Sequence, residues 1–117
     1  MKPAPIKPPV SIDVLEQLDI RIGTILSAEE VPDSRKLVEL RVDFGDQVRA
    51  ILSGMKGERD DLQALVGLQT IFVVNLEPRK MAGRLSEGML LDLGYADGLR
   101  PALALPEHPL PNGSRAG

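Results

Sequence analysis

The sequence has few of the residues and segments on which many functions depend. Among its 117 residues there is no cysteine and only one histidine, His108. A disulfide framework, a thiolate metal site, a cysteine nucleophile and a metal site of several histidines are therefore excluded. No stretch approaches the roughly 18–20 apolar residues of a transmembrane helix, and the N-terminus lacks the apolar run of a secretory signal. We expect a one-domain, cytoplasmic protein with no cofactor, metal or membrane partner.

Aromatic residues and positive charge are scarce as well. Phe44, Phe72 and Tyr95 are the only aromatic residues. Proteins that bind single-stranded nucleic acid stack bases on several exposed aromatics, so general single-strand binding is disfavoured. Seventeen acidic residues against 14 basic ones give a net charge of −3. Any affinity for phosphate must therefore come from a local cluster of cations.

Most of the sequence is patterned as short strands. Residues 37–44 alternate apolar and polar side chains, which predicts a strand with one buried face, and Gly45-Asp46 predicts a tight turn after it. Residues 70–76 are almost continuously apolar, as a buried strand is. Gly23 indicates a bulge or a bend in the first strand. The expected strands cover residues 20–26, 37–44, 47–53 and 70–76, and residues 89–93 and 102–105 are the last strand candidates.

Two short helices are expected beside these strands. Residues 1–10 hold four prolines and predict a disordered head. Ser11 is typical of a helix N-cap, so a helix is expected over 11–18. Leu62 and Leu65 suggest another short helix between the third and fourth strands. The whole pattern predicts an all-β, five-stranded OB-fold barrel over residues 11–117, with an irregular C-terminal tail.

The predicted loop after the apolar 70–76 strand is rich in cations. Arg79, Lys80 and Arg84 lie within six residues, with no acid among them. Such side chains neutralise phosphates, and the side chains of Ser86 and Asn75 can bond sugar or base edges. An ordinary solvated loop is the alternative interpretation.

No residue pattern indicates catalysis. Asp60-Asp61 and Glu29-Glu30 are typical of solvated surface, and His108 lies among prolines in the predicted tail, a poor place for a precisely held base. There is neither a P-loop nor a GxGxxG motif. We therefore expect no enzymatic activity.

Several short stretches, taken in order, have the spacing of a family signature. They are Asp19–Ile25 (DIRIGTI), Lys36–Asp46 (KLVELRVDFGD), Ile51–Gly54 (ILSG), Leu65–Gly67 (LVG), Val74–Gly83 (VNLEPRKMAG), Ser86–Leu91 (SEGMLL) and Pro111–Ser114 (PNGS). The combination resembles the tRNA-binding domain family. That family includes the C-terminal domain of methionyl-tRNA synthetases, free-standing dimeric tRNA-binding proteins, EMAP-II-like domains and CsaA-type export-related chaperones.

The resemblance implies a tRNA-binding surface on one side of an OB-fold barrel. Arg84 is a further cation of the same loop. The family positions that contact or orient tRNA correspond to Lys36, Ser53, Asn75, Arg79, Lys80, Ser86 and Met89.

The resemblance also implies a homodimer that uses the N-terminal helix and the C-terminal tail. Val14, Leu15, Leu18 and Leu110 supply apolar groups in these two segments, outside the expected barrel. Three functions stay open. The chain is a structure-selective tRNA binder that assists an aminoacyl-tRNA synthetase, a CsaA-like chaperone that binds unfolded preproteins, or a scaffolding barrel.

Overall fold

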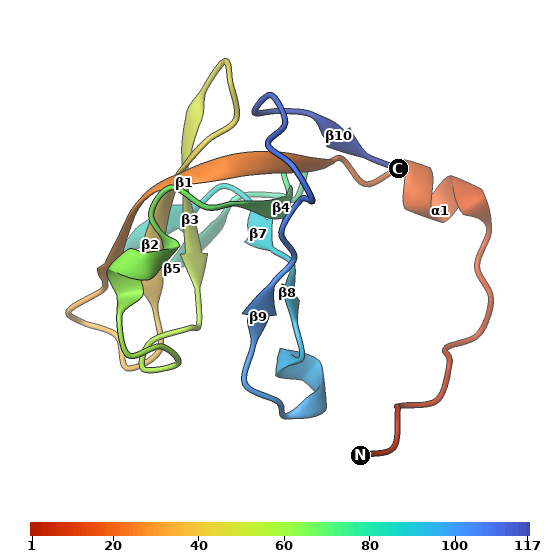
Figure 1. Cartoon of the computed structure of the whole chain (residues 1–117), viewed down its shortest axis with the longest axis horizontal. Coiled ribbons are helices and arrows are strands. Elements are labelled where there is room, and N and C mark those ends of the chain that lie inside the picture. Colours follow the sequence, from red (N-terminus) through yellow and green to blue (C-terminus); the bar gives the residue numbers. More distant parts are fainter.

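The computed structural model describes all 117 residues and shows one curled sheet with two small hairpins attached (Figure 1). The prediction of an all-β, OB-type fold is confirmed. The α-helix is α1 and the two 3-10 helices are η1 and η2. In chain order the elements are α1 (Ile12–Glu16), β1 (Ile20–Glu30), β2 (Val38–Asp43), β3 (Val48–Ser53), η1 (Leu62–Leu65), β4 (Gln69–Val73), β5 (Arg79–Met81), β6 (Arg84–Ser86), β7 (Met89–Leu90), β8 (Asp92–Leu93), η2 (Tyr95–Asp97), β9 (Ala102–Leu103) and β10 (Arg115–Ala116).

The main sheet is antiparallel and has the strand order β3-β2-β1-β4-β7, with β10 paired to β1. β6 and β7 also pack against β3, at the opposite edge of the sheet. The backbone N–H of Glu87 donates to the carbonyl of Ala50 at 2.9 Å across this closure. The sheet therefore curls towards a barrel, and β5–β6 and β8–β9 are separate two-stranded hairpins.

β1 is the longest strand and joins the rest of the sheet. Its first half pairs with β4 and its second half with β2, with a register shift between Ile25 and Ser27. The bulge expected at Gly23 lies there instead. A Cβ on Gly23 would lie 2.5 Å from Val42 Cγ1 and 2.8 Å from Phe44 Cε1. Glycine is therefore required at this position because the core packs directly against the backbone.

The core lies on the concave side of the sheet. Leu40, Ile51 and Phe72 are fully buried within it. The alternation predicted for 37–44 is confirmed, because Val38, Leu40, Val42 and Phe44 are all buried. The rings of Phe44 and Phe72 meet edge to face, with centroids 5.4 Å apart.

The basic segment expected as a loop is a β-hairpin. β5 and β6 pair through a turn whose two central residues, Ala82 and Gly83, have φ angles of 49° and 74°. Positive φ at both positions is the geometry that matches the twist of two adjoining strands. Glycine adopts a positive φ freely, whereas alanine does so rarely. Of the two turn residues, only Gly83 therefore indicates this turn in the sequence.

The C-terminal tail, expected to be irregular, ends as a strand. The side-chain oxygen of Asn112 accepts hydrogen bonds from Thr24 Oγ1 at 2.7 Å and Gln69 Nε2 at 2.9 Å. Gly113 follows with a φ of 90°, and its N–H donates to the Ile22 carbonyl. These bonds guide β10 onto β1.

The helices are short. Ser11 caps α1 as predicted, accepting from the Asp13 N–H at 3.2 Å, but the helix ends at Glu16 and buries none of its residues. The expected helix between β3 and β4 is the single 3-10 turn η1. Residues 1–10 form neither helix nor strand and make a wide arc from α1, outside the sheet (Figure 1). None of the helices has the length and apolarity needed to cross a bilayer.

Candidate nucleic-acid interface

The β5–β6 hairpin carries three of the predicted cations and presents them on two faces. The register pairs Arg79 with Ser86, Lys80 with Leu85 and Met81 with Arg84. Because cross-strand pairs alternate between faces, Arg79 and Arg84 share one face and Lys80 lies on the other. The hairpin therefore divides its positive charges between two faces, with two arginines on one face and Lys80 on the other.

Arg79 and Lys80 of the hairpin, and Lys36 outside it, have no ion-pair partner within the protein. Arg84 Nη1 lies 3.3 Å from Glu39 Oε1 on β2, so its charge is partly balanced. The other two ion pairs of the protein do not involve Arg79, Lys80 or Lys36. All three of these side chains are exposed. Their charges are therefore available to an anionic ligand.

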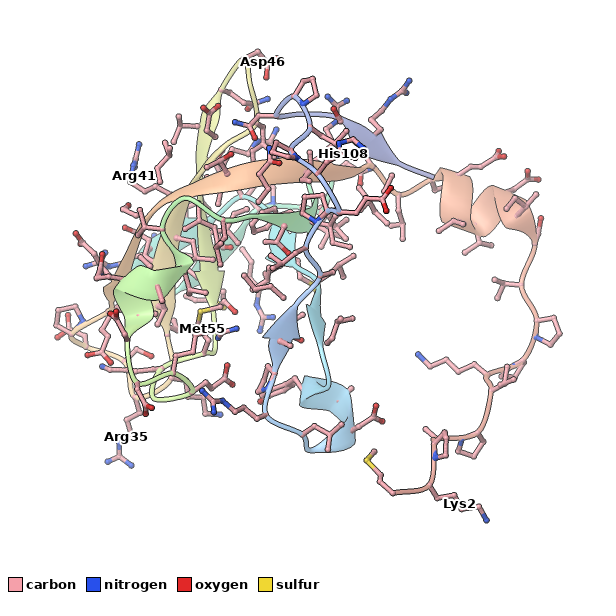
Figure 2. The ribbon with its side chains drawn as sticks, viewed as in Figure 1. Lys2, Arg35, Arg41, Asp46, Met55 and His108 are labelled. Carbon is pink, nitrogen blue, oxygen red and sulfur yellow. The ribbon has the colours of Figure 1, made fainter.

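Lys36 and Ser53 lie at one end of the β2–β3 hairpin. Ser53 is the last residue of β3 and pairs with Val38, the first residue of β2. Lys36 precedes this pair, and its carbonyl accepts from the Lys56 N–H at 3.0 Å. Figure 2 shows its neighbour Arg35 pointing away from the barrel, at the opposite end of the molecule from Asp46.

Ser86 is buried, with 3% of its surface exposed. Its hydroxyl accepts from the Leu52 N–H at 3.0 Å and donates to the Gly88 carbonyl at 3.1 Å. Ser86 therefore fastens β6 to β3, a role that the sequence did not indicate.

Asn75 is exposed, but its amide is bonded to the backbone. Its Oδ1 accepts from the Asp19 N–H at 2.7 Å, and its Nδ2 donates to the Gln17 carbonyl at 2.8 Å. These bonds tie the end of β4 to the junction between α1 and β1. The amide retains one N–H and one lone pair.

Met89 lies on β7 and is about half exposed, opposite Val73. The next residue, Leu90, is buried in the core. Of the eight predicted residues, four therefore lie on the β5–β6 hairpin itself, Met89 follows it on β7, and Asn75 lies at its base near α1.

Sequence reasoning missed Arg49. Its Nη1 donates to the carbonyls of Val74, at 2.6 Å, and Glu87, at 3.1 Å. Its Nε donates to Gln47 Oε1 at 2.9 Å. A signal was present in the sequence. Arg49 alternates with Ile51, whose side chain faces the core, so a charge stands at an inward position of β3.

Two carboxyl groups outside the hairpin have altered acidity. A hydrogen bond from Arg21 lowers the pKa of Asp19, against the opposing effect of burial. Burial raises the pKa of Glu58, and the nearby Asp92 adds to the effect while Arg59 opposes it. Arg59 Nη1 lies 3.8 Å from Glu58 Oε1, too far for a hydrogen bond. No three His, Cys, Asp or Glu side chains gather into a group that could hold a metal ion.

Residues 20–115 match the family model described as "Putative tRNA binding domain". The chain belongs to this tRNA-binding domain family. The matched range contains all the strands except the last residue of β10, and the whole β5–β6 hairpin.

The relatives of this tRNA-binding domain include methionine–tRNA ligases. The ligase of Methanocaldococcus jannaschii is 46% identical over 82 residues, which are 70% of this chain and 12% of the ligase. The ligase of Parabacteroides distasonis is 40% identical over 113 residues, 97% of this chain and 16% of the ligase. The tRNA-binding domain thus spans less than one fifth of the length of these relatives.

Two solved structures share the fold along almost their whole length. The MetRS related protein from Pyrococcus horikoshii has a TM-score of 0.86 and 32% identity, covering 95% of this chain and 100% of that one. The chaperone CsaA from Bacillus anthracis strain Ames has a TM-score of 0.83 and 30% identity, covering 94% of this chain and 100% of that one. The resemblance stated from the sequence is confirmed.

Proposed function

We propose that this tRNA-binding domain is a non-catalytic protein that binds tRNA by its shape and acts as a cytoplasmic homodimer. The observation that carries the proposal is the β5–β6 hairpin, with Arg79 and Lys80 exposed and unpaired on its two faces. Lys36 adds a third unpaired cation, and Arg84 contributes once Glu39 releases it.

The aromatic residues favour folded RNA over single strands. Phe44 and Phe72 are buried, which leaves only Tyr95, 62% exposed, as a surface for stacking. A single ring cannot support successive unstacked bases. An A-form helix offers phosphates and 2′-hydroxyls, which cations and polar groups can contact without reading sequence. Little discrimination among tRNAs is expected.

The predicted residues then divide into two roles. Arg79, Lys80 and Lys36 contact phosphates. Asn75 contacts a sugar or base edge with the part of its amide that remains free. Ser86 holds the hairpin in place through its two internal hydrogen bonds.

The remaining predicted residues, Ser53 and Met89, border this surface. Ser53 is half-buried at the end of β3, and Met89 lies about half exposed on β7. We propose that both contact the RNA backbone as neutral groups, so that replacing either one changes affinity without changing its dependence on salt.

A titration of tRNA at low salt tests the proposal. Replacing Arg79 and Lys80 by alanine should weaken binding and flatten the dependence of log K on log salt by about one unit for each phosphate that is no longer neutralised. The double variant Lys7→Ala/Arg100→Ala removes the same charge from exposed positions outside the hairpin and should bind as wild type does. Equal affinity in wild type and the Arg79/Lys80 variant would contradict the assignment.

The homodimer proposal rests on apolar groups left uncovered. Ile12, Leu15 and Leu18 of the α1 region are 43–64% exposed. They line one groove together with residues 114–117, and Figure 1 shows the C-terminus beside α1. A permanent dimer buries on the order of 1,600 Å² or more, for which these segments supply apolar surface. Sedimentation at micromolar concentration should give twice the chain mass, whereas a mass near 12.7 kDa would refute it.

The same groove supports a second candidate function. The groove has a mixed lining in which exposed apolar side chains such as Ile12 and Leu15 can accept apolar peptide segments, and the similar CsaA protein is described as a chaperone. A peptide array beside the tRNA titration separates the two functions. If the wild-type protein binds peptides and does not bind tRNA, the chaperone function is favoured.

A further inference from the structure

The orientation of the β5–β6 hairpin depends on its base. β5 and β6 pair only with each other and form a sheet of their own. An isolated two-stranded hairpin is at best marginally stable in water. Its direction relative to the barrel must therefore be set by contacts to neighbouring elements.

Arg49 is the side chain that holds both ends of this segment. Val74 immediately precedes residues 75–86 and Glu87 immediately follows them. One guanidinium nitrogen of Arg49 donates to both of their carbonyls, at 2.6 and 3.1 Å. The other anchors grip a single end, because Ser86 bonds only to β3 and Gly88, and Asn75 bonds only to the α1–β1 junction.

The guanidinium is itself held in place. Its Nε donates to Gln47 Oε1 at 2.9 Å, and the half-buried side chain lines a pocket together with Phe44 and Val74. Its planar set of donors gives a more rigid connection than a flexible ammonium would. It forms no ion pair, so its hydrogen bonds to carbonyls account for its place in the fold.

We propose that Arg49 is a positioning residue of the RNA interface. It closes the base of the hairpin and so presents Arg79 and Lys80 at a fixed spacing, without touching RNA itself. Fixing the hairpin before binding reduces the ordering cost that association must meet. The proposal rests on the proposed function, because it assigns Arg49 a part in the same tRNA surface.

The test compares Arg49→Met with wild type in two measurements. Methionine keeps an apolar stem of similar length and removes every donor. Amide hydrogen exchange should become faster in residues 79–86 and stay unchanged in β2. Affinity for tRNA should fall about tenfold, since two hydrogen bonds that hold the interface are removed. The slope of affinity against salt should remain that of wild type, because every phosphate-binding cation is still present.

Two further variants separate positioning from general stability and from direct contact. Thr70→Val removes a hydrogen bond from Thr70 Oγ1 to the Ala104 carbonyl, 3.0 Å long, away from the hairpin. It should lower stability and leave tRNA affinity unchanged. Arg49→Lys should recover part of the affinity. Lys56 shows that an ammonium in this protein can bridge two carbonyls, donating to Val31 at 3.2 Å and Ser34 at 2.7 Å.

The outcomes are distinct. If Arg49→Met binds tRNA with wild-type affinity, Arg49 has no positioning role. If the salt dependence of its affinity falls by one unit, Arg49 contacts a phosphate directly, which also overturns the positioning role. If Thr70→Val loses as much tRNA affinity as Arg49→Met, the loss in Arg49→Met is explained by lower protein stability and not by the position of the hairpin. If wild type itself fails to bind tRNA, the proposed function is wrong. Unchanged hydrogen exchange in Arg49→Met would separately refute the clamp, which is the pair of hydrogen bonds from Arg49 to the Val74 and Glu87 carbonyls. If Arg49→Met does not fold, Arg49→Lys carries the same two measurements.

Discussion

Ser86→Ala distinguishes a residue that holds the interface from one that contacts the ligand. The substitution deletes one oxygen from a site that is 3% exposed. The Leu52 N–H, 3.0 Å from that oxygen, then stays buried without an acceptor. An unsatisfied buried donor costs about 1–3 kcal/mol. At this chain length about 1 kcal/mol corresponds to roughly 4 °C in Tm, so the midpoint should fall by roughly 4–12 °C.

Urea and thermal unfolding followed by circular dichroism measure the loss, and a tRNA titration at low temperature measures the interface. Ser53→Ala is the matched control for the unfolding measurement alone, because it removes a hydroxyl one residue from Leu52 and leaves the Leu52 N–H bonded to Ser86. It should shift the midpoint much less. A Ser86→Ala protein with wild-type stability and abolished tRNA binding would refute this reasoning, since the hydroxyl would then act on RNA.

Three other substitutions test separate features. Gly23→Ala places a methyl group against Val42 and Phe44, and this overpacking should lower the free energy of unfolding in urea by about 1–3 kcal/mol. An unchanged urea midpoint would show that the core rearranges around the methyl group without cost. In Gly113→Ala the new methyl group would clash with the Phe44 carbonyl, and the φ of 90° at this position is one that alanine rarely adopts. The substitution should therefore release β10 and speed exchange of the Ile22 amide, which donates to the Ser114 carbonyl. Unaltered exchange would contradict this expectation. Glu58→Gln concerns pH. Because burial raises the pKa of Glu58, the folded protein favours the protonated form, and ionisation destabilises it above the folded pKa. The variant should therefore gain stability at pH 8 and gain little at pH 3.5, and a gain independent of pH would argue against burial as the cause.

The central strands could be predicted because their side chains alternate. In β2 every second residue is buried, and the alternation survives in the sequence because both faces have distinct surroundings. The β5–β6 hairpin has no such contrast, since Arg79, Lys80, Arg84 and Leu85 are all exposed. Its turn depends on Ala82 with positive φ, which alanine rarely adopts.

The tail escaped prediction for a different reason. β10 is two residues long and pairs with β1, more than 90 positions earlier in the chain, so no local pattern records it. In the candidate site, the cations could be named from the sequence because exposed charges need no partner. The buried hydroxyl of Ser86 and the clamp formed by Arg49 depend on distant carbonyls and amides, which only the folded chain brings together.

The pairing of β10 with the start of β1 also affects how this domain can be joined to other chains. Residue 117 ends beside α1, so the two ends of the folded unit lie close together (Figure 1). Units with adjacent ends can be inserted into a loop of a host protein without stretching it. A tag or fusion partner attached at Gly117 would emerge directly into the groove lined by Ile12 and Leu15 and block it. Attachment at residue 1 places the partner at the far end of the ten-residue arc, separated from the C-terminus by α1 (Figure 1).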